Sequence, residues 1–558
     1  MKKILPFIIG TAFLIGIILR IWQISKVPIA LFGDELDVGL QANSILTTGK
    51  DYFGNKFPLM FHSFAEYRLP MQLYLAAPFI KVFGLNELGV RGPAVLMGLL
   101  SVLSFYFLAK ELFGRKVAVI SSLFLLYSPW HFNFSRQAND AGILLPFVIF
   151  ATYFFLKGRR DFKYLVISTI LFSLSIYTYA IASLFAPIFV MGLSVVFRRE
   201  IFAHGVKKLV LLGALCLLIL SPYLNWTVRG KTTKRISDIS AIPKAEVVAE
   251  VENARKFSAG IPGKLFYNKA TVITTRLFEN YTQAFSPAFL FARGDSNTRN
   301  SVDEFGQMYH LDALFVLIGL SLVIYGLMAK KGHKREFWII VLWLILAPIP
   351  SALTKGGGSH ASRLILMLPP LILLSSLGFE SLMGIKKSFI RKAVLTITIL
   401  IMIFEVTRFM NHYFFVWPVK NWRLWQYGFK ETLEFVQTQD KSYQKIYLNS
   451  TYEPMLPRFL FYYKYDMAAF QQEFEKDTFD KEIVPGVDGF KLGQKYYFGD
   501  LKKPMENLAD PNILVVASAE KDATNPEIFN GRGLNLIKTT YAPDGMPIFY
   551  VFFGAPKK

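Results

Sequence analysis

The sequence predicts a multi-pass α-helical membrane protein with a small α/β domain at its C-terminal end. Three observations support this fold class. Of the 558 residues, 53% are hydrophobic and only 18% are charged, and the mean hydropathy is +0.36. Apolar runs of about 20 residues recur up to residue 410, and this is the length at which a helix spans a bilayer. After residue 411 the runs give way to short β-branched and aromatic segments.

We expect about eleven transmembrane helices from these runs. The runs cover residues 4–22, 92–112, 117–134, 140–157, 163–180, 182–197, 207–226, 311–329, 337–353, 362–383 and 391–410. The first run starts with charged residues, but it is long and no small-residue cleavage site follows, so we interpret it as an uncleaved span. A further run, 68–84, is short and contains Lys81 and two prolines. It is expected to form an interfacial or re-entrant helix instead of crossing.

The basic residues predict the orientation of the spans. If 68–84 does not cross and the N-terminus is cytoplasmic, every dense basic cluster falls in a cytoplasmic connection. These clusters are KELFGRK, KGRRDFK, RREIFAHGVKK, KKGHKRE and KKSFIRK. This is the positive-inside pattern, and it accounts for a net charge of +22 without a nucleic-acid partner. The loops 23–91 and 227–310 and the C-terminal region then lie outside the cytoplasm.

The C-terminal region has the pattern of a small extracytoplasmic α/β domain. The segments KIYLNSTY, NILVVASA and PIFYVFF resemble strands, and WRLWQYGFKETLEFVQTQ resembles a helix. We therefore divide the chain into a transmembrane module, 1–410, and a domain at 411–558. The single cysteine, Cys216, excludes an intrachain disulfide and a cysteine metal cluster. There is also no Walker motif for an ATP-driven pump.

Unusual polar residues gather on the outer side in this topology. They are Asp34, Glu35 and Asp37, Glu66 and Arg68, Arg91, Arg136 and Asp140, and His360 and Arg363. Ionisable residues at membrane depth are costly and are candidates for function. Arginines suit a phosphate through bidentate hydrogen bonds, and a neighbouring carboxylate can accept a proton from an attacking hydroxyl or amine. This combination suits transfer of a group from a lipid phosphate to an acceptor outside the cytoplasm.

Each of these residues also has a simpler interpretation. DELD could be a helix start with Asp34 as the N-cap and Asp37 at the third helical position. Arg91 could extend to the headgroups from the start of a span. Arg136 and Asp140, four residues apart, could form a local ion pair. His360 and Arg363 could be ordinary loop residues near the headgroups.

Several motifs resemble the GT-C glycosyltransferases of family 39, which include protein O-mannosyltransferases and the bacterial aminoarabinose transferase of lipid A. The motifs are GDE after the first span, YRLPMQLYLAAPFIKVFGLNELGVRGP, LAKELFGRKVAVISSLFLLYSPWHFNFSRQANDAG and HASRLILMLPPLILL. The resemblance covers roughly residues 1–410, and it implies the GT-C fold with a long first outer loop. It also implies an inverting transfer from a polyprenyl-phosphate monosaccharide.

The resemblance implies roles for the outer residues. Asp34 matches the catalytic acid that acts as general base on the acceptor, and Glu35 completes the acidic pair. Arg68, Arg91, Arg136 and Arg363 would contact the donor phosphate, with Glu66, Asp140 and His360 in support. Arg68 stands one residue out of register with the family's phosphate-binding lysine. No divalent metal is expected to be required, because the sequence shows no dense cluster of metal ligands.

Two other functions fit the same features. A ligase of this superfold would move a preassembled oligosaccharide, and a flippase or transporter would move a lipid-linked sugar. A transporter is expected to show paired repeats and broken helices at the midplane, and the sequence has no internal repeat. The expected location is the plasma (inner) membrane. The acceptor could be a protein, a lipid or a glycan.

Overall fold

The computed structural model describes residues 4–64, 67–230, 243–258, 260–329, 333–476, 490–499, 501, 510–522, 525–527 and 533–554. The chain forms two compact units. The helical unit consists of Met1–Trp22 and Ala94–Tyr413, and the sheet unit consists of Gln23–Pro93 and Phe414–Lys558. The first outer loop thus belongs to the same unit as the C-terminal region, which the sequence did not indicate. The boundary at residue 410 between two functional domains stays a prediction.

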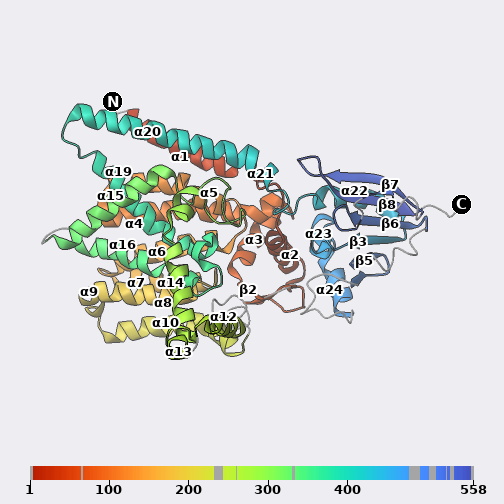
Figure 1. Ribbon diagram of the computed structural model, residues 1–558, viewed down its shortest axis with the longest axis horizontal. Helices are drawn as coiled ribbons and strands as arrows, with labels where there is room; N and C mark the ends of the chain where they lie inside the picture. Colours follow the sequence, from red (N-terminus) through yellow and green to blue (C-terminus); the bar gives the residue numbers. More distant parts are fainter. Residues whose placement is uncertain are drawn as a thin grey trace. The chain divides into compact units, whose positions relative to one another are not determined.

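The helical unit is built almost wholly from helices (Figure 1). Its longer helices are α1 (Ile4–Ile21), α4 (Glu87–Tyr127, which starts in the sheet unit), α6 (Asp140–Gly158), α7 (Phe162–Ile176), α8 (Ala182–Val196), α10 (Val206–Val228), α12 (Lys244–Phe257), α14 (Lys269–Gln283), α15 (His310–Met328), α16 (Lys334–Leu346), α19 (Leu368–Leu382) and α20 (Ser388–Asn411). Its short helices are α5 (Pro129–Phe134), α9 (Arg198–Phe202), α13 (Gly260–Phe266), η1 (Ala288–Ala292), α17 (Ile349–Ala352), η2 (Gly357–Ser359), α18 (Ala361–Leu364) and η3 (Ile365–Met367).

The apolar runs are helical, and the fold class is confirmed. Within the described residues, seven helices are long and apolar enough to cross a membrane. They are Glu87–Tyr127, Asp140–Gly158, Val206–Val228, His310–Met328, Lys334–Ala352, Ala361–Leu382 and Ser388–Lys420. Glu87–Tyr127 covers the expected run 92–112 and the first part of the run 117–134, with the non-helical Gly114, whose φ is 84°, between them. The rest of the second run forms α5. The runs at α1, α7 and α8 form shorter apolar helices.

Close helix packing holds the core of the helical unit together. α15 and α19 cross where each has a glycine against the backbone of the other. A Cβ atom on Gly319 would lie 2.1 Å from the carbonyl oxygen of Leu374, and one on Gly378 would lie 2.1 Å from that of Phe315. Small residues allow such close approach, and this is how helices associate in lipid without a hydrophobic driving force.

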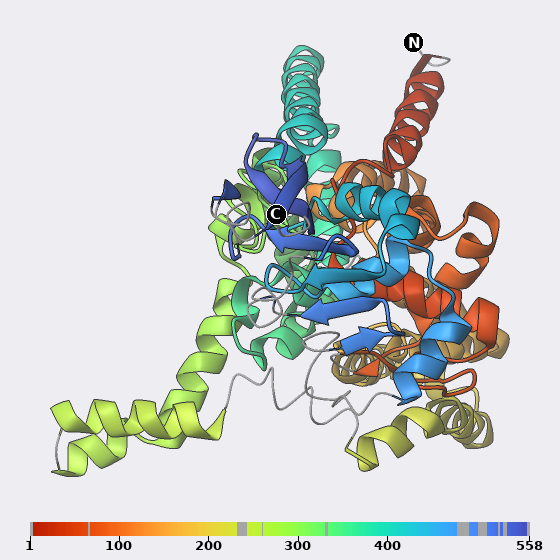
Figure 2. The same cartoon turned by 90° about the vertical axis from the view of Figure 1, so that its right-hand side faces the viewer.

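The sheet unit contains a mixed six-stranded sheet in the order β4-β5-β3-β6-β8-β7, visible at the front of Figure 2. The strands are β4 (Phe490–Leu492), β5 (Tyr496–Gly499), β3 (Lys445–Asn449), β6 (Ile513–Ser518), β8 (Pro547–Gly554) and β7 (Leu534–Tyr541). β3 runs parallel to β5 and β6, with Ile446 opposite both Tyr496 and Leu514, and the other pairs are antiparallel. The three strand-like segments thus form β3, β6 and β8, as expected.

Helices complete the C-terminal part of this unit: α21 (Trp417–Lys420), α22 (Phe429–Gln439), α23 (Met455–Tyr462) and α24 (Met467–Lys476), with η4 (His412–Val416) and η5 (Asp440–Ser442). The expected helix over 422–439 begins only at Phe429. Gly428 precedes it with φ 103°, and this backbone conformation stops a helix from extending further toward the N-terminus. α22 packs on β8, and Thr432 Oγ1 lies 2.8 Å from Thr540 Oγ1 of β7.

The first outer loop supplies α2 (Gly33–Thr48), α3 (Met71–Phe83) and the short pair β1 (Phe61–His62) and β2 (Tyr67–Arg68). α3 corresponds to the ambiguous run 68–84. Its buried Ala76, Ala77 and Ile80 pack against Val38 and Ala42 of α2. Its expected position at the membrane interface stays a prediction.

α2 also packs closely on α23. A Cβ atom on Gly39 would lie 2.7 Å from the ring of Phe461 and 2.8 Å from Val90. The helix that carries DELD is therefore held between early and late parts of the chain within the sheet unit.

Candidate functional site

α2 begins with the acids of GDELD. The N-cap residue is Phe32, and its backbone N–H donates to Glu35 Oε2 at 3.3 Å. Glu35 therefore satisfies one of the free N–H groups at the helix start. The alternative interpretation in which Asp34 is the N-cap is wrong, because the N-cap lies two residues earlier, at Phe32, and the helix starts at Gly33. This leaves the Asp34 side chain 59% exposed.

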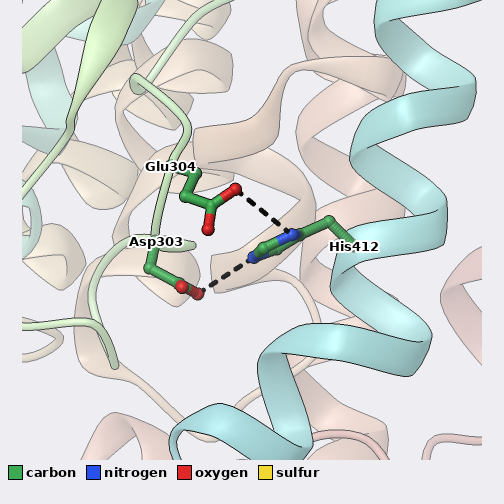
Figure 3. A group of neighbouring side chains, drawn as sticks. All are labelled: Asp303, Glu304 and His412. Carbon is green, nitrogen blue, oxygen red and sulfur yellow. Dashed lines mark hydrogen bonds and ion pairs between the residues drawn. The ribbon is translucent and has the colours of Figure 1, made fainter.

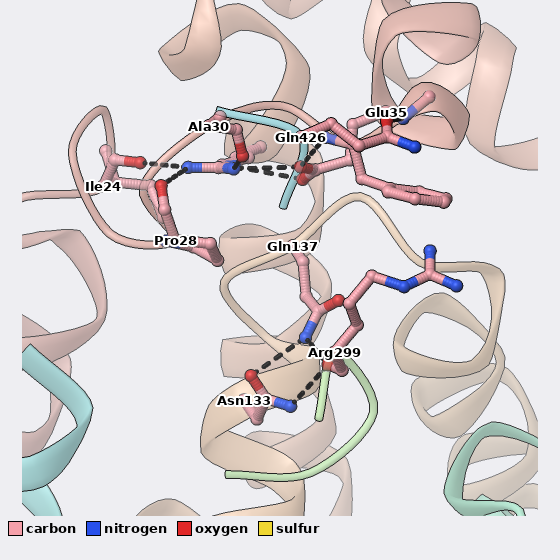
Figure 4. Close-up of polar contacts among 11 residues, drawn as sticks. Ile24, Pro28, Ala30, Glu35, Asn133, Gln137, Arg299 and Gln426 are labelled. Carbon is pink, nitrogen blue, oxygen red and sulfur yellow. Dashed lines mark hydrogen bonds and ion pairs between the residues drawn. The ribbon is translucent and has the colours of Figure 1, made fainter. Parts of the chain in front are cut away.

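Arg91 is buried against the start of α2, and the upper part of Figure 4 shows its partners Ile24, Pro28, Ala30 and Glu35. Its Nε donates to Glu35 Oε1 at 3.0 Å, and Nη2 donates to Glu35 Oε2 at 2.9 Å and to the Ala30 carbonyl at 2.6 Å. Nη1 donates to the carbonyls of Ile24 at 3.0 Å and Pro28 at 2.9 Å. A guanidinium has five N–H donors, and all five are used here. Arg91 therefore does not extend to the headgroups, and its function is to fix Glu35 and the loop before α2.

Arg68 lies between two aspartates on the same helix. Its Nη2 pairs with Asp34 Oδ1, and its Nε lies 3.0 Å from Asp37 Oδ2. Asp37 is buried and accepts a hydrogen bond from Ser63 Oγ at 2.5 Å. Burial raises the pKa of Asp37, and the charge of Arg68 opposes this rise. The sheet unit thus brings Asp34, Asp37 and Arg68 together around one partly exposed carboxylate.

The C-terminal region contacts the start of α2. The N–H of Gly33 donates to Gln426 Oε1 at 3.0 Å, and Gln426 Oε1 also accepts from Arg458 Nη2. Arg458 is buried, with its guanidinium 4.4 Å from the ring centre of Phe429. Burial lowers the pKa of Arg458 to about 10, so it stays charged at neutral pH. This glutamine and arginine position the residue next to Asp34.

Arg136 and Asp140 lie in the helical unit. Arg136 is buried and donates from Nη1 to the carbonyls of Leu19 at 2.7 Å and Arg20 at 2.8 Å. Asp140 is the first residue of α6, next to the N-cap Asn139, whose side chain accepts from the N–H of Ala141 at 2.9 Å. Arg136 thus ties the end of α1 to the segment between α5 and α6.

His360 and Arg363 lie just before and within α18. Arg363 Nη1 donates to Thr354 Oγ1 at 2.7 Å and to the Lys355 carbonyl at 3.1 Å. Burial, followed by the charge of Arg363, lowers the pKa of His360 to about 4, so the imidazole is neutral at physiological pH. The N–H of Ala361 donates to Asp295 Oδ2 at 2.9 Å, which connects this segment to the loop after η1.

That loop is also held by α5. The side chains of Asn133 and Gln137 both donate to the carbonyl of Arg299, at 3.0 and 2.9 Å (Figure 4). The helical unit thus places the segments of Arg136, His360 and Arg363 in one hydrogen-bonded framework. The ninth predicted residue, Glu66, lies outside the described residues.

One group of side chains could hold a metal ion. Asp303, Glu304 and His412 offer ligand atoms within 4.8 Å of one another (Figure 3). His412 Nε2 lies 3.1 Å from Asp303 Oδ1, and His412 Nδ1 lies 4.0 Å from Glu304 Oε2. The sequence missed this cluster because 109 positions separate Asp303 from His412.

The fold is that of GT-C membrane glycosyltransferases. ArnT from Cupriavidus metallidurans in the apo state matches with a TM-score of 0.53 at 12% identity, over 100% of this chain and 100% of that chain. The apo oligosaccharyltransferase of Archaeoglobus fulgidus matches with a TM-score of 0.51 at 13% identity, over 97% of this chain and 74% of that chain. Another ArnT structure contains undecaprenyl phosphate, with a TM-score of 0.53 at 12% identity and 100% of both chains covered.

The family model of dolichyl-phosphate-mannose-protein mannosyltransferases matches residues 67–226. No curated protein matches the sequence. The resemblance expected from the motifs is thus confirmed, and a membrane glycosyltransferase is the class of function that the family match supports.

Proposed function

We propose that this protein transfers a sugar from a polyprenyl-phosphate-linked donor to an acceptor on the extracytoplasmic face of the membrane. The observation that carries the proposal is the group at the start of α2. There Asp34 is 59% exposed and is held by Arg68, whose second carboxylate partner is Asp37. A carboxylate fixed in this way can accept a proton, and the adjacent guanidinium can neutralise a phosphate.

In the proposed reaction, Asp34 takes the proton from the attacking hydroxyl or amine of the acceptor. The acceptor atom forms a bond to the anomeric carbon of the sugar from the side opposite the phosphate. The bond from that carbon to the phosphate oxygen breaks, the electron pair stays on the phosphate, and the configuration inverts. Arg68 stabilises the negative charge that grows on the leaving phosphate.

Glu35 and Arg91 have a positioning role in this proposal. Glu35 caps α2 and accepts two hydrogen bonds from Arg91, so three hydrogen bonds hold its carboxylate in place. The roles predicted for Arg136, Arg363, Glu66, Asp140 and His360 rest on the family resemblance alone.

We also propose that the protein lies in the plasma (inner) membrane with a cytoplasmic N-terminus, on the evidence of the basic clusters. The reaction as written involves no metal. The alternatives are an oligosaccharide ligase, which would require a preassembled glycan on the donor, and a flippase, which would bind the donor without breaking its glycosidic bond.

The test uses the full chain in detergent with radiolabelled polyprenyl-phosphate mannose, glucose and aminoarabinose. We expect release or transfer of sugar from one of these donors, and a decrease of about 10³-fold in Asp34→Asn, as is typical for loss of a general base. The control is Glu527→Gln, an exposed acid of the sheet unit, which should keep wild-type activity.

Three outcomes would contradict the proposal. Turnover that persists in Asp34→Asn would remove Asp34 as the base. Turnover of a lipid-linked oligosaccharide but of no monosaccharide donor would favour the ligase. Equal donor binding by wild type and Asp34→Asn, with no turnover when candidate protein, lipid and glycan acceptors are added, would favour the flippase.

A further inference from the structure

A cavity of about 290 Å³ lies between α7, α8 and α10 of the helical unit. Its lining is mostly apolar and includes Phe172, Val190, Leu212 and Leu220. Its size is roughly twice that of an apolar cavity of about 150 Å³ that accepts benzene. The cavity is thus large enough for a segment of a hydrocarbon chain.

One face of helix α10 lines the cavity over several turns. Leu209, Leu212, Gly213, Cys216 and Leu220 line it with the three- and four-residue spacing of one helix face. No residue of α10 is buried. A helix of this length in a membrane normally packs against its neighbours, and an unfilled gap forfeits the dispersion contacts of all the atoms that line it. Filling the cavity with an apolar chain would restore those contacts.

Two of the polar side chains that line the cavity, Ser168 and Ser173, have hydrogen-bond partners within the protein. Ser168 Oγ donates to the carbonyl of Ala151 at 2.8 Å, and Ser173 Oγ donates to Cys216 Sγ at 3.6 Å. These two hydroxyls therefore do not require water in the cavity, and an apolar occupant leaves their hydrogen bonds intact.

One end of the cavity is surrounded by basic residues. Three lining residues, Leu165, Ile201 and Leu209, lie within three positions of such residues in the sequence. The basic residues are Lys163, Arg198, Arg199, Lys207 and Lys208. Positive charge at the mouth of an apolar cavity suits a lipid whose headgroup is anionic.

Some of this charge is balanced by acids. Lys163 pairs with Asp161 at 2.9 Å, and Glu200 pairs with Arg335. Among the residues that the structure describes, Arg198, Arg199 and Lys207 have no carboxylate partner. This end of the cavity therefore keeps excess positive charge.

We propose that this cavity binds an acyl chain of an anionic phospholipid, with its headgroup at the basic end. By the positive-inside pattern, this end faces the cytoplasm. The phosphate of a glycosyl donor is expected on the opposite side of the membrane, so the headgroup position favours a phospholipid over the donor. The inference does not depend on the catalytic role of Asp34, and binding can be measured without turnover.

Cys216 provides a local reporter, because it is the only cysteine of the chain and lines the cavity. The first experiment measures the rate at which a small maleimide modifies Cys216 in the full-length protein in detergent. We expect added phosphatidylglycerol to slow modification about 10-fold, and phosphatidylcholine of the same chains to slow it much less. Equal protection by both lipids, or none, would overturn the proposal. Protection by polyprenyl phosphate alone would assign the cavity to the donor lipid instead.

The second experiment fills the cavity. Gly213 lines it, and a Cβ atom there would meet no atom within 4 Å. Gly213→Leu should therefore fold, and its Tm should no longer rise with phosphatidylglycerol. The control is Gly10→Leu on α1, where the space around the Cβ is also open and the lipid response should persist. A Gly213→Leu protein that still responds to phosphatidylglycerol like wild type would place the lipid elsewhere.

The third experiment tests the headgroup. Lys207→Gln combined with Arg199→Gln should reduce the difference between phosphatidylglycerol and phosphatidylcholine at least 3-fold, while leaving some protection by both. An unchanged preference in this double variant would contradict the basic end as the headgroup position.

Discussion

Two arginines contact the first turn and a half of α2 in different ways. Arg91 is fully buried, and Glu35 and three backbone carbonyls take all its donors. The Arg68 side chain is 14% exposed, and one of its partners, Asp34, is 59% exposed. A cation with no donor left can only hold structure, whereas a cation paired with an exposed carboxylate can exchange that partner for a substrate group. We infer from this difference that the chemistry belongs to the Arg68 group and not to the Arg91 group.

The largest effect should come from breaking the buried group. Arg91→Met removes from the buried carboxylate of Glu35 its two hydrogen bonds to a cation. Removing one partner of a buried pair typically costs about 3–5 kcal/mol. We expect a clearly lower Tm in detergent, and partial recovery in Arg91→Met with Glu35→Leu. A Tm within 2 °C of wild type for the single variant would show that the pair does not stabilise the sheet unit.

Arg68→Ala should affect catalysis more than stability. Loss of a donor that stabilises transition-state charge lowers kcat by about 10²–10³-fold. The pair with the exposed Asp34 contributes on the order of 1 kcal/mol to stability, and the buried Asp37, whose pKa is already raised, can take up a proton when Arg68 is removed. The measurement is kcat beside Tm, with Arg68→Lys as the conservative variant, which should recover part of kcat. If Arg68→Ala lowered the Tm as much as Arg91→Met does and left kcat unchanged, the two arginines would have the same structural role.

His360 extends the comparison to the helical unit. Burial keeps its imidazole neutral, whereas Arg68 and Arg91 are charged and ion-paired. Its pKa is about 4 in the folded protein, against about 6.5 in an unfolded chain. As the pH falls from 6.5 to 4, the unfolded state takes up the proton first, so folding loses up to about 3 kcal/mol. The Tm of wild type should therefore fall over this window more steeply than that of His360→Gln. Parallel Tm curves would exclude a depressed pKa.

The smallest expected effect concerns the contact between the C-terminal region and α2. Gln426→Ala removes the acceptor of the Gly33 N–H and a partner of Arg458. A lost hydrogen bond of this kind costs about 1 kcal/mol, and we expect kcat to fall a few-fold with KM unchanged. A rise in KM for the acceptor alone would instead place Gln426 in contact with substrate.

The spans and the late strands could be predicted because their signals are local. An apolar run such as 362–383 and a β-branched segment such as NILVVASA reflect burial that neighbouring residues share. The start of WRLWQYGFKETLEFVQTQ was placed too early, because Gly428 outweighs the helical pattern around it. The grouping of residues 23–93 with the C-terminal region depends on contacts such as Gly39 with Phe461, and no local pattern records a contact across that distance.

The site, like the fold, was predictable only where its signals are local. DELD and RLP identified Asp34 and Arg68, because charges beside apolar runs are conspicuous. The sequence did not separate Arg91 from Arg68, because exposure and the number of occupied donors are properties of the folded chain. It also left Asp37 without a role and missed Gln426, Arg458 and the Asp303–Glu304–His412 cluster. A glutamine in a polar stretch has no signal until its partner is known.

The contacts between the C-terminal region and α2 have a consequence for biosynthesis. Helix α2 leaves the ribosome among the first 50 residues, but Gln426, Arg458 and Gln471, which hold it, follow hundreds of residues later. The helix therefore cannot reach its final setting until translation is nearly complete. A chain that stalls in the membrane would hold every span and still lack the contacts that fix the start of α2, so under the proposed function unfinished copies would not consume the sugar donor.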